Sequence, residues 1–117
     1  MPLLNVYTSA EPPGPERADA LLKDLSATLA RSLGKPEAYV MTSLVPRARM
    51  SFGGTFAPAC YAELKNIGRF SADETSRLSA ELTRKLSEGL GVAADRIYIE
   101  FQNAEPHLWG HDGGTFG

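Results

Sequence analysis

Residues 60–102, CYAELKNIGRFSADETSRLSAELTRKLSEGLGVAADRIYIEFQ, decide the fold, because they carry the signals of a strand, a helix and a second strand in turn. The segment Cys60–Ile67 alternates apolar and polar residues, which is typical of a half-buried strand. Ser71 and Glu74 have the spacing of a capping box, in which each side chain bonds a free amide at the start of a helix. We expect this helix to run to Leu90. Its apolar ladder consists of leucines four residues apart, namely Leu78, Leu82, Leu86 and Leu90.

The other expected elements repeat this order. Residues 96–102 alternate apolar and polar side chains and are expected to form the last strand. Leu3–Thr8 is a short apolar run that predicts the first strand, and the prolines at 11–15 mark a turn after it. We expect a helix from about Glu16 to Leu33 and a strand over Ala38–Val45. The apolar face of that helix consists of Ala18, Leu21, Leu22, Leu25, Leu29 and Leu33.

The two halves of the chain predict two β-α-β units that share one four-stranded sheet. We expect an α+β fold with a single domain over residues 1–117, in which two α/β-type units place both helices on one face of the sheet. Two helices cover only that face. We assign Leu3, Val40, Ile97 and Ile99 to the other face, and predict that further copies of the chain cover it in a homo-oligomer.

Composition excludes several classes of function. The 117 residues include 12 lysines and arginines and 14 acidic residues, so the net charge of −2 predicts no nucleic-acid partner. No apolar run is long enough to span a membrane. One cysteine excludes an internal disulfide and a thiolate metal cluster. The first residues lack the features of a signal peptide, so we expect a cytoplasmic protein and leave open secretion without a signal.

Few residues have the spacing of a familiar catalytic or metal site. There is no phosphate-binding glycine loop and no G-x-S-x-G motif. His107 and His111 lie four residues apart, but Pro106 and Gly110 disfavour the helix that would bring them together, so we expect no metal. Cys60 is expected to be a buried, unreactive thiol.

Pro2 is the unusual candidate. A small second residue favours removal of Met1, and the chain would then begin with a secondary amine. An α-amino group has a reference pKa of about 8 in water, and apolar surroundings lower that pKa because they disfavour the charged form. Pro2 would then be a general base near neutral pH. The alternative is that Pro2 only opens the first strand.

Six motifs occur in order along the chain: MPLLNV, LGKPEAYVMTSLVP, FGGTFAP, NIGR, DRIYIEF and WGHDGGTFG. Together they resemble the macrophage migration inhibitory factor family, within the tautomerase superfamily. The resemblance extends from Pro2 to Phe116, and it looks closest to bacterial and cyanobacterial members.

The resemblance implies a homotrimer whose sheets line a central channel. It also implies an enzyme that needs no cofactor. The amino-terminal proline, here Pro2, would interconvert the keto and enol forms of a 2-oxo acid such as phenylpyruvate.

The resemblance assigns roles to four further residues. Lys35 would bind the substrate carboxylate and lower the pKa of the nearby amine; the alternative is a solvated lysine at a helix end. Ile67 would bond the same carboxylate through its backbone amide, unless it is an ordinary strand-end residue. Tyr98 would enter the pocket from a neighbouring subunit, contribute to the subunit interface, or both. Phe116 would lie near the pocket mouth.

Three departures from the family pattern bear on activity. Glu100 stands where vertebrate members have asparagine, and its carboxylate would repel an anionic substrate or hold the Pro2 ammonium. His111 and Asp112 stand where many family members have a Trp-Asn pair, and Trp109 lies two residues before His111. This difference would change the rim of the pocket and thus the substrate preference. The segment Ala59–Ala62 lacks the vertebrate CxxC motif, so thiol–disulfide oxidoreductase activity is not expected.

Two alternatives to the enzyme remain open. One is a cytokine-like protein that binds a receptor and has a vestigial pocket, although nothing in the sequence itself supports a receptor. The other is a trimeric scaffold with a decayed site, which Glu100 and His111 keep in consideration.

Overall fold

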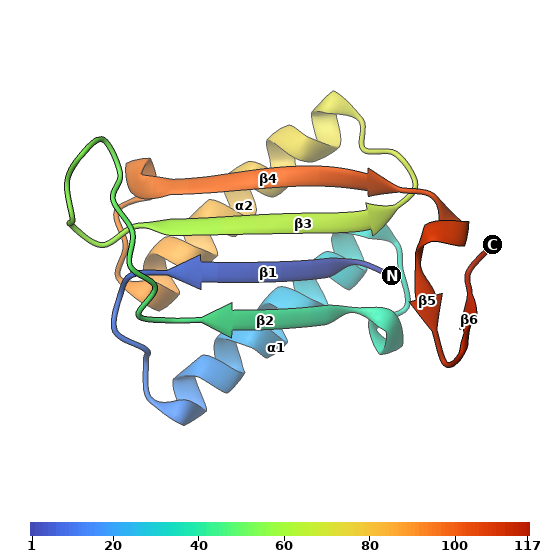
Figure 1. Cartoon of the computed structure of the whole chain (residues 1–117), viewed down its shortest axis with the longest axis horizontal. Helices are drawn as coiled ribbons and strands as arrows, with labels where there is room; N and C mark the ends of the chain where they lie inside the picture. The colour runs from blue at the N-terminus through green and yellow to red at the C-terminus, as the bar shows by residue number, and fades with distance from the viewer.

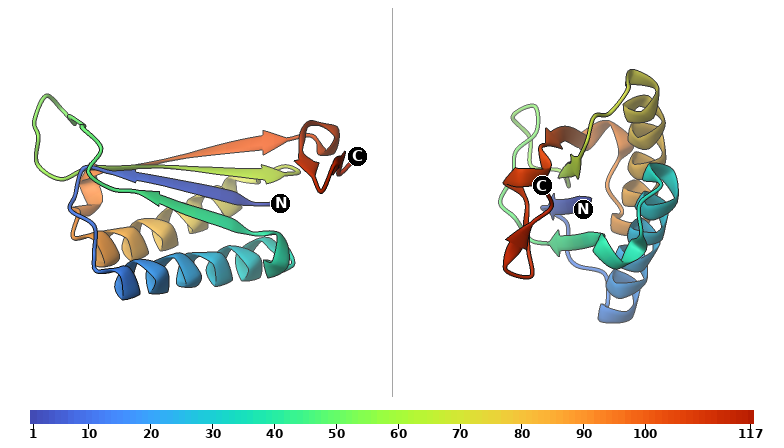
Figure 2. Two further views of the ribbon diagram at one scale, coloured as in Figure 1. Left: turned by 60° about the horizontal axis from the view of Figure 1, so that its bottom comes forward. Right: turned by 90° about the vertical axis from the view of Figure 1, so that its right-hand side faces the viewer.

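The computed structural model describes residues 1–117 and contains a four-stranded sheet with two helices packed on one face (Figure 1; Figure 2, left). A small hairpin near the C-terminus lies beyond one end of this sheet. In chain order the elements are β1 Leu3–Thr8, α1 Pro15–Leu33, η1 Glu37–Tyr39, β2 Met41–Val45, β3 Cys60–Ile67, α2 Ala72–Leu90, η2 Ala94–Arg96, β4 Ile97–Ala104, η3 Pro106–Leu108, β5 Gly110–His111 and β6 Gly114–Thr115.

The sheet has the strand order β2-β1-β3-β4. Strand β1 pairs with β2 in parallel, and β3 pairs with β4 in parallel. The two units meet where β1 pairs antiparallel with β3. The predicted α+β fold of two β-α-β units is thereby confirmed.

The ends of both helices follow from their sequences. Helix α2 begins with the predicted capping box. The Ser71 hydroxyl accepts a hydrogen bond from the Glu74 amide at 3.1 Å, and the Glu74 carboxylate accepts one from the Ser71 amide at 3.0 Å. Helix α1 has Pro15 in its first turn, where the missing amide hydrogen costs nothing. Each helix ends at a left-handed glycine, Gly34 with φ 61° and Gly91 with φ 69°.

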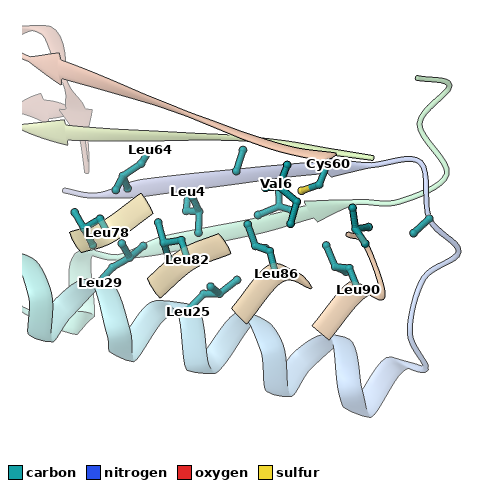
Figure 3. Close-up of a cluster of buried hydrophobic side chains, with 14 residues drawn as sticks. Leu4, Val6, Leu25, Leu29, Cys60, Leu64, Leu78, Leu82, Leu86 and Leu90 are labelled. Atoms are coloured by element: carbon teal, nitrogen blue, oxygen red, sulfur yellow. The ribbon is translucent and has the colours of Figure 1, made fainter. Parts of the chain in front are cut away.

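The core fills the layer between the sheet and the helices (Figure 3). Leu4 and Val6 of β1 point toward the helices, and Leu25 and Leu29 of α1 pack against them from below. The leucine ladder of α2 is buried beside them, as predicted. Burial of each such leucine contributes about 1.5–3 kcal/mol of transfer free energy to folding.

Two strand boundaries differ from the prediction. Ala38 and Tyr39 belong to the short 3₁₀ helix η1 instead of β2, because the Tyr39 amide bonds the Pro36 carbonyl at 3.1 Å. Strand β4 starts at Ile97 and extends to Ala104, since its pairing with β3 continues to the last residue of that strand.

The residues assigned to the open face of the sheet were mostly wrong. Val40, Ile97 and Ile99 pack against the core under the helices. Because side chains alternate along a strand, Tyr98 and Glu100 point to the open face instead. Leu3 does lie on the open face, opposite the buried Leu4.

The open face has an apolar and aromatic row next to a polar row. Val45, Tyr7, Tyr61 and Tyr98 share one row, and Ser43, Asn5, Glu63 and Glu100 share the next. Tyr98 is 65% exposed and Val45 44% exposed, so this face lacks a partner within the chain. Neither helix combines the length and apolar character needed to cross a membrane.

Candidate active site

A pocket of about 280 Å³ lies at the start of β1. The first residues of the chain, the η1–β2 segment and the C-terminal tail meet there, and Figure 2 (right) shows the tail beside the N-terminus. Most of the wall is apolar. The lining residues are Met1, Pro2, Leu3, Ala38, Tyr39, Val40, Met41, Trp109, Gly110, His111 and Phe116.

Pro2 is held firmly in this pocket. Its side chain is fully buried, and its carbonyl accepts the Met41 amide at 3.0 Å, which extends the β1–β2 pairing by one bond. The pyrrolidine ring is therefore fixed by the sheet, and solvent does not reach its apolar face.

The terminal amine next to Pro2 is in surroundings that disfavour a proton. In the unprocessed chain the Met1 ammonium donates to the Tyr39 carbonyl at 2.9 Å. Partial burial lowers the pKa of this amine, and the positive charge of Lys35 lowers it further.

Lys35 and Ile67 meet at the end of β3, and neither is among the residues that line this pocket. The charge of Lys35 nevertheless lowers the pKa of the terminal amine. The Lys35 ammonium donates to the Ile67 carbonyl at 3.3 Å. The left-handed Gly34 ends α1, and the Lys35 amide bonds the Ala30 carbonyl at 3.0 Å, which fixes where the lysine leaves the helix. No carboxylate of the chain lies within ion-pair distance of Lys35. The ammonium is therefore available to an anionic ligand.

The C-terminal tail forms part of the pocket wall. Strands β5 and β6 are joined by Asp112 and Gly113, which both have positive φ values, 50° and 81°. Two such residues are typical of the tight turn of a two-residue hairpin. The Phe116 amide then bonds the Trp109 carbonyl at 3.2 Å and holds the end of the tail against the pocket.

Three rings form an aromatic cluster on this wall, namely Tyr39, His111 and Phe116. His111 stacks on Phe116 with ring centres 5.5 Å apart and an interplanar angle of 21°. Tyr39 meets both rings edge-on, at 5.5 Å from His111 and 5.8 Å from Phe116. These contacts present a flat, largely apolar surface to the pocket.

Tyr98 lies far from Pro2 within one chain. Its partners across the sheet are Tyr61 and then Tyr7, which lies at the opposite end of β1 from Pro2. The Tyr98 ring packs 4.9 Å from that of Phe52 beside a second, largely apolar cavity of about 370 Å³. A contact between Tyr98 and the Pro2 pocket therefore requires a neighbouring subunit and stays a prediction.

Glu100 does not contact Pro2 of its own chain either. Its carboxylate accepts the Gln102 amide at 2.7 Å and the Tyr61 hydroxyl at 3.1 Å. The same hydroxyl lies 3.2 Å from Glu63. Desolvation, followed by the hydrogen bond to Glu100, raises the pKa of Tyr61 to about 12. Within the chain, Glu100 therefore belongs to a polar network on the open face, and a contact between Glu100 and the Pro2 ammonium stays a prediction.

The comparisons with known proteins identify the family of this chain. The family model described as "Macrophage migration inhibitory factor (MIF)" matches residues 1–117. The chain belongs to the MIF family.

Relatives and solved structures cover nearly the whole of this MIF-family chain. A MIF homologue of Trichuris trichiura is 34% identical over 116 residues, which are 99% of this chain and 100% of the relative. The crystal structure of a MIF homologue from Prochlorococcus marinus has a TM-score of 0.94 at 43% identity, over 98% of this chain and 99% of that one. The MIF structure of Toxoplasma gondii has a TM-score of 0.91 at 31% identity, over 97% of this chain and 99% of that one. Family membership places this MIF-family chain in the tautomerase superfamily, which supports an isomerase-type activity.

One position of this MIF-family chain differs from what the sequence suggested. Tyr39 was missed, although it supplies both a carbonyl to the terminal amine and a ring to the pocket wall. Its place directly after the Lys35 motif was the available signal, but it was assigned to a strand. Cys60 is buried as expected, and burial raises the pKa of its thiol to about 12.

Proposed function

We propose that this MIF-family protein is a cofactor-free keto–enol tautomerase of 2-oxo acids such as phenylpyruvate. Pro2, after removal of Met1, is the base. The observation that carries the proposal is the buried position of Pro2 in an apolar pocket, together with the positive charge of Lys35, which has no carboxylate partner and lowers the pKa of the terminal amine.

The proposed reaction moves one proton. The neutral Pro2 amine takes a proton from the carbon next to the 2-oxo group, and the electrons of that C–H bond form the C=C bond of the enol. The oxygen becomes negatively charged and takes the proton back from the Pro2 ammonium. General acid–base catalysis of this kind contributes about 10²- to 10⁴-fold to a rate.

Lys35 has two parts in this proposal. Its ammonium binds the substrate carboxylate, together with the backbone amide of Ile67. Its charge also lowers the pKa of the terminal amine, and the same effect would favour the neutral form of Pro2 once Met1 is removed. The apolar lining of the pocket strengthens both effects, because it excludes water.

We also propose that the assembly is a homotrimer in which Tyr98 of one subunit reaches the pocket of the next. The open sheet face supports an oligomer, since it exposes large apolar side chains such as Met41, Val45 and Tyr98. Tyr98 lies at the far end of the sheet from Pro2 within one chain, so only a neighbour places it at the pocket.

The test is the rate of phenylpyruvate tautomerisation by purified protein whose loss of Met1 is confirmed by intact mass. Pro2→Gly removes the fixed ring and is expected to lower kcat/KM about 100-fold. A form that keeps a residue before Pro2 has an amide nitrogen there and should give no rate above buffer. Absence of a rate with Pro2 free would contradict the proposal and favour a receptor-binding or scaffold role.

A further inference from the structure

The Arg96 guanidinium is fully bonded to one loop of the chain. Its Nε donates to the Pro58 carbonyl at 3.0 Å. Nη1 donates to the Phe52 carbonyl at 3.3 Å and the Thr55 hydroxyl at 2.9 Å. Nη2 donates to the Thr55 carbonyl at 3.3 Å and the Ala57 carbonyl at 2.9 Å. A guanidinium has five N–H groups in a planar fork, so these bonds use its whole donor capacity.

All of these acceptors lie in residues 52–58, within the loop that joins β2 to β3 and extends beyond the end of the sheet (Figure 1). Gly53 and Gly54 form a tight turn with φ values of 59° and 75°, and Phe52 pairs with Thr55 across it. Apart from those of Arg96, no hydrogen bond joins residues 52–58 to the rest of the chain. Arg96 is therefore the polar attachment that fixes this loop.

Arg96 also links the loop to Tyr98. The guanidinium lies over the Phe52 ring, 5.2 Å from its centre, and the other side of this contact is the Tyr98 ring, 4.9 Å from that of Phe52. Phe52 is the only aromatic partner of the exposed Tyr98 within the chain. A cavity of about 370 Å³ lies beside both rings. Without the Phe52 contact, the Tyr98 ring has room to adopt another side-chain rotamer.

We propose that Arg96 is a positioning residue that acts through Phe52 and holds the Tyr98 ring in the orientation that reaches the pocket of the neighbouring subunit. The inference rests on the proposed tautomerase function and the proposed homotrimer. Arg96 acts on the pocket of the neighbour and not on that of its own chain, because β4 begins opposite Thr8, at the far end of β1 from Pro2. A ring that is ordered before binding loses less entropy when the substrate binds.

Arg96→Lys tests this role with the charge retained. Lysine lacks the planar fork and cannot hold these acceptors together. Misplacing a group by about 1 Å costs about 100-fold in rate, so kcat/KM for phenylpyruvate should fall about 10- to 100-fold. Phe52→Leu keeps the backbone bonds of Arg96 but removes the intervening ring, and it should give a similar loss. Arg31→Lys is the matched control, since the exposed Arg31 side chain forms no hydrogen bond or ion pair, and it should have no effect. A loss that only follows loss of the trimer, as native mass spectrometry shows, would overturn the positioning role.

Mixed trimers separate an effect on the neighbour from an effect on the same chain. Arg96→Lys refolded with an equal amount of Pro2→Gly should regain about a quarter of intact sites, because each such site takes Pro2 from one chain and Arg96 with Tyr98 from the next. Refolded with Tyr98→Ala, it should stay at the mean of the two variants, since no chain then carries both Arg96 and Tyr98. The reverse pattern of recovery would overturn the inference.

A second measurement does not depend on activity. In protein labelled with 3-fluorotyrosine, Tyr98→Phe identifies the Tyr98 signal among those of the four tyrosines in the ¹⁹F NMR spectrum. Arg96→Lys should shift or broaden this signal and leave that of Tyr39, at the other end of the sheet, unchanged. An unchanged Tyr98 signal would overturn the inference even in an active enzyme. If the native protein does not react although Pro2 is free, the tautomerase proposal fails, and the NMR comparison alone decides whether Arg96 positions Tyr98.

Discussion

The start of β1 brings three residues from distant parts of the chain into one neighbourhood. Pro2 is fixed by its bond to Met41, and Lys35 leaves the end of α1 to meet the last residue of β3, Ile67. None of these contacts is local in sequence. The sheet pairing and the end of α1 therefore determine the chemistry available at the pocket.

Among individual residues, Lys35 is the one whose replacement is expected to have the clearest effect on substrate binding. Lys35→Gln should raise KM for phenylpyruvate about 10- to 100-fold, because a hydrogen bond between charged groups contributes about 1.5–3 kcal/mol. It should also raise the pKa of the terminal amine, since Lys35 lowers that pKa. Steady-state kinetics over a pH series measures both effects.

Lys23→Gln is the matched control, because Lys23 lies exposed on α1 and forms no ion pair. It should leave KM unchanged. Equal effects of the two substitutions would show that general surface charge, and not the position of Lys35, governs binding.

The sequence predicted part of this neighbourhood. The motifs around Pro2, Lys35, Ile67 and Phe116 identified residues that the fold brings to one end of the sheet. Tyr39 was missed because an alternating segment resembles a strand, whereas the Pro36 carbonyl closes a 3₁₀ turn there.

At the scale of elements, local chemistry determines where the helices begin and end. The capping box of α2 satisfies two amides that the helix cannot bond internally. The boundaries of α2, β1 and β3 could be predicted because these signals lie within a few residues of each end.

Removal of the cap should destabilise the fold measurably. Ser71→Ala is expected to lower the free energy of unfolding by about 1 kcal/mol, because the Glu74 amide loses its partner. Urea unfolding at a fixed protein concentration measures this difference. Ser76→Ala, at an exposed interior position of the same helix, should cost nothing since alanine favours helix. A similar loss in both variants would contradict the role of the cap.

The face of β4 that packs on the helices could not be assigned with the same ease. The alternation in residues 97–101 is plain, but an apolar side suits a subunit interface as well as a helix layer. Ile97, Ile99 and Phe101 pack there because they form the more apolar side of the strand. Tyr98, placed on the other side, is thereby left exposed.

At the scale of the whole molecule, one sheet face is covered by helices and the other is open (Figure 2). The pocket at the start of β1 and the Tyr98 ring at the other end of the sheet lie apart in each chain. In the proposed homotrimer these two regions meet across subunits.

Mixed assemblies test this arrangement. Pro2→Gly and Tyr98→Ala should each lower activity when purified alone. When the two variants are unfolded and refolded together at equal amounts, about a quarter of the sites combine an intact Pro2 with an intact Tyr98 from a neighbour. Activity should return to that fraction. Mixed trimers that form, as sedimentation and native mass spectrometry show, but regain no activity would exclude a shared site.

The pKa of the Pro2 amine tests the proposed base most directly. An NMR titration of protein labelled with ¹⁵N-proline, with loss of Met1 confirmed, gives this value. Burial and Lys35 both favour the neutral amine, so its pKa should lie below the usual value of about 8. Because the neutral form is the base, kcat/KM should rise with pH through the same value. A pKa at or above 8, or a rate that does not follow this titration, would contradict the role of Pro2.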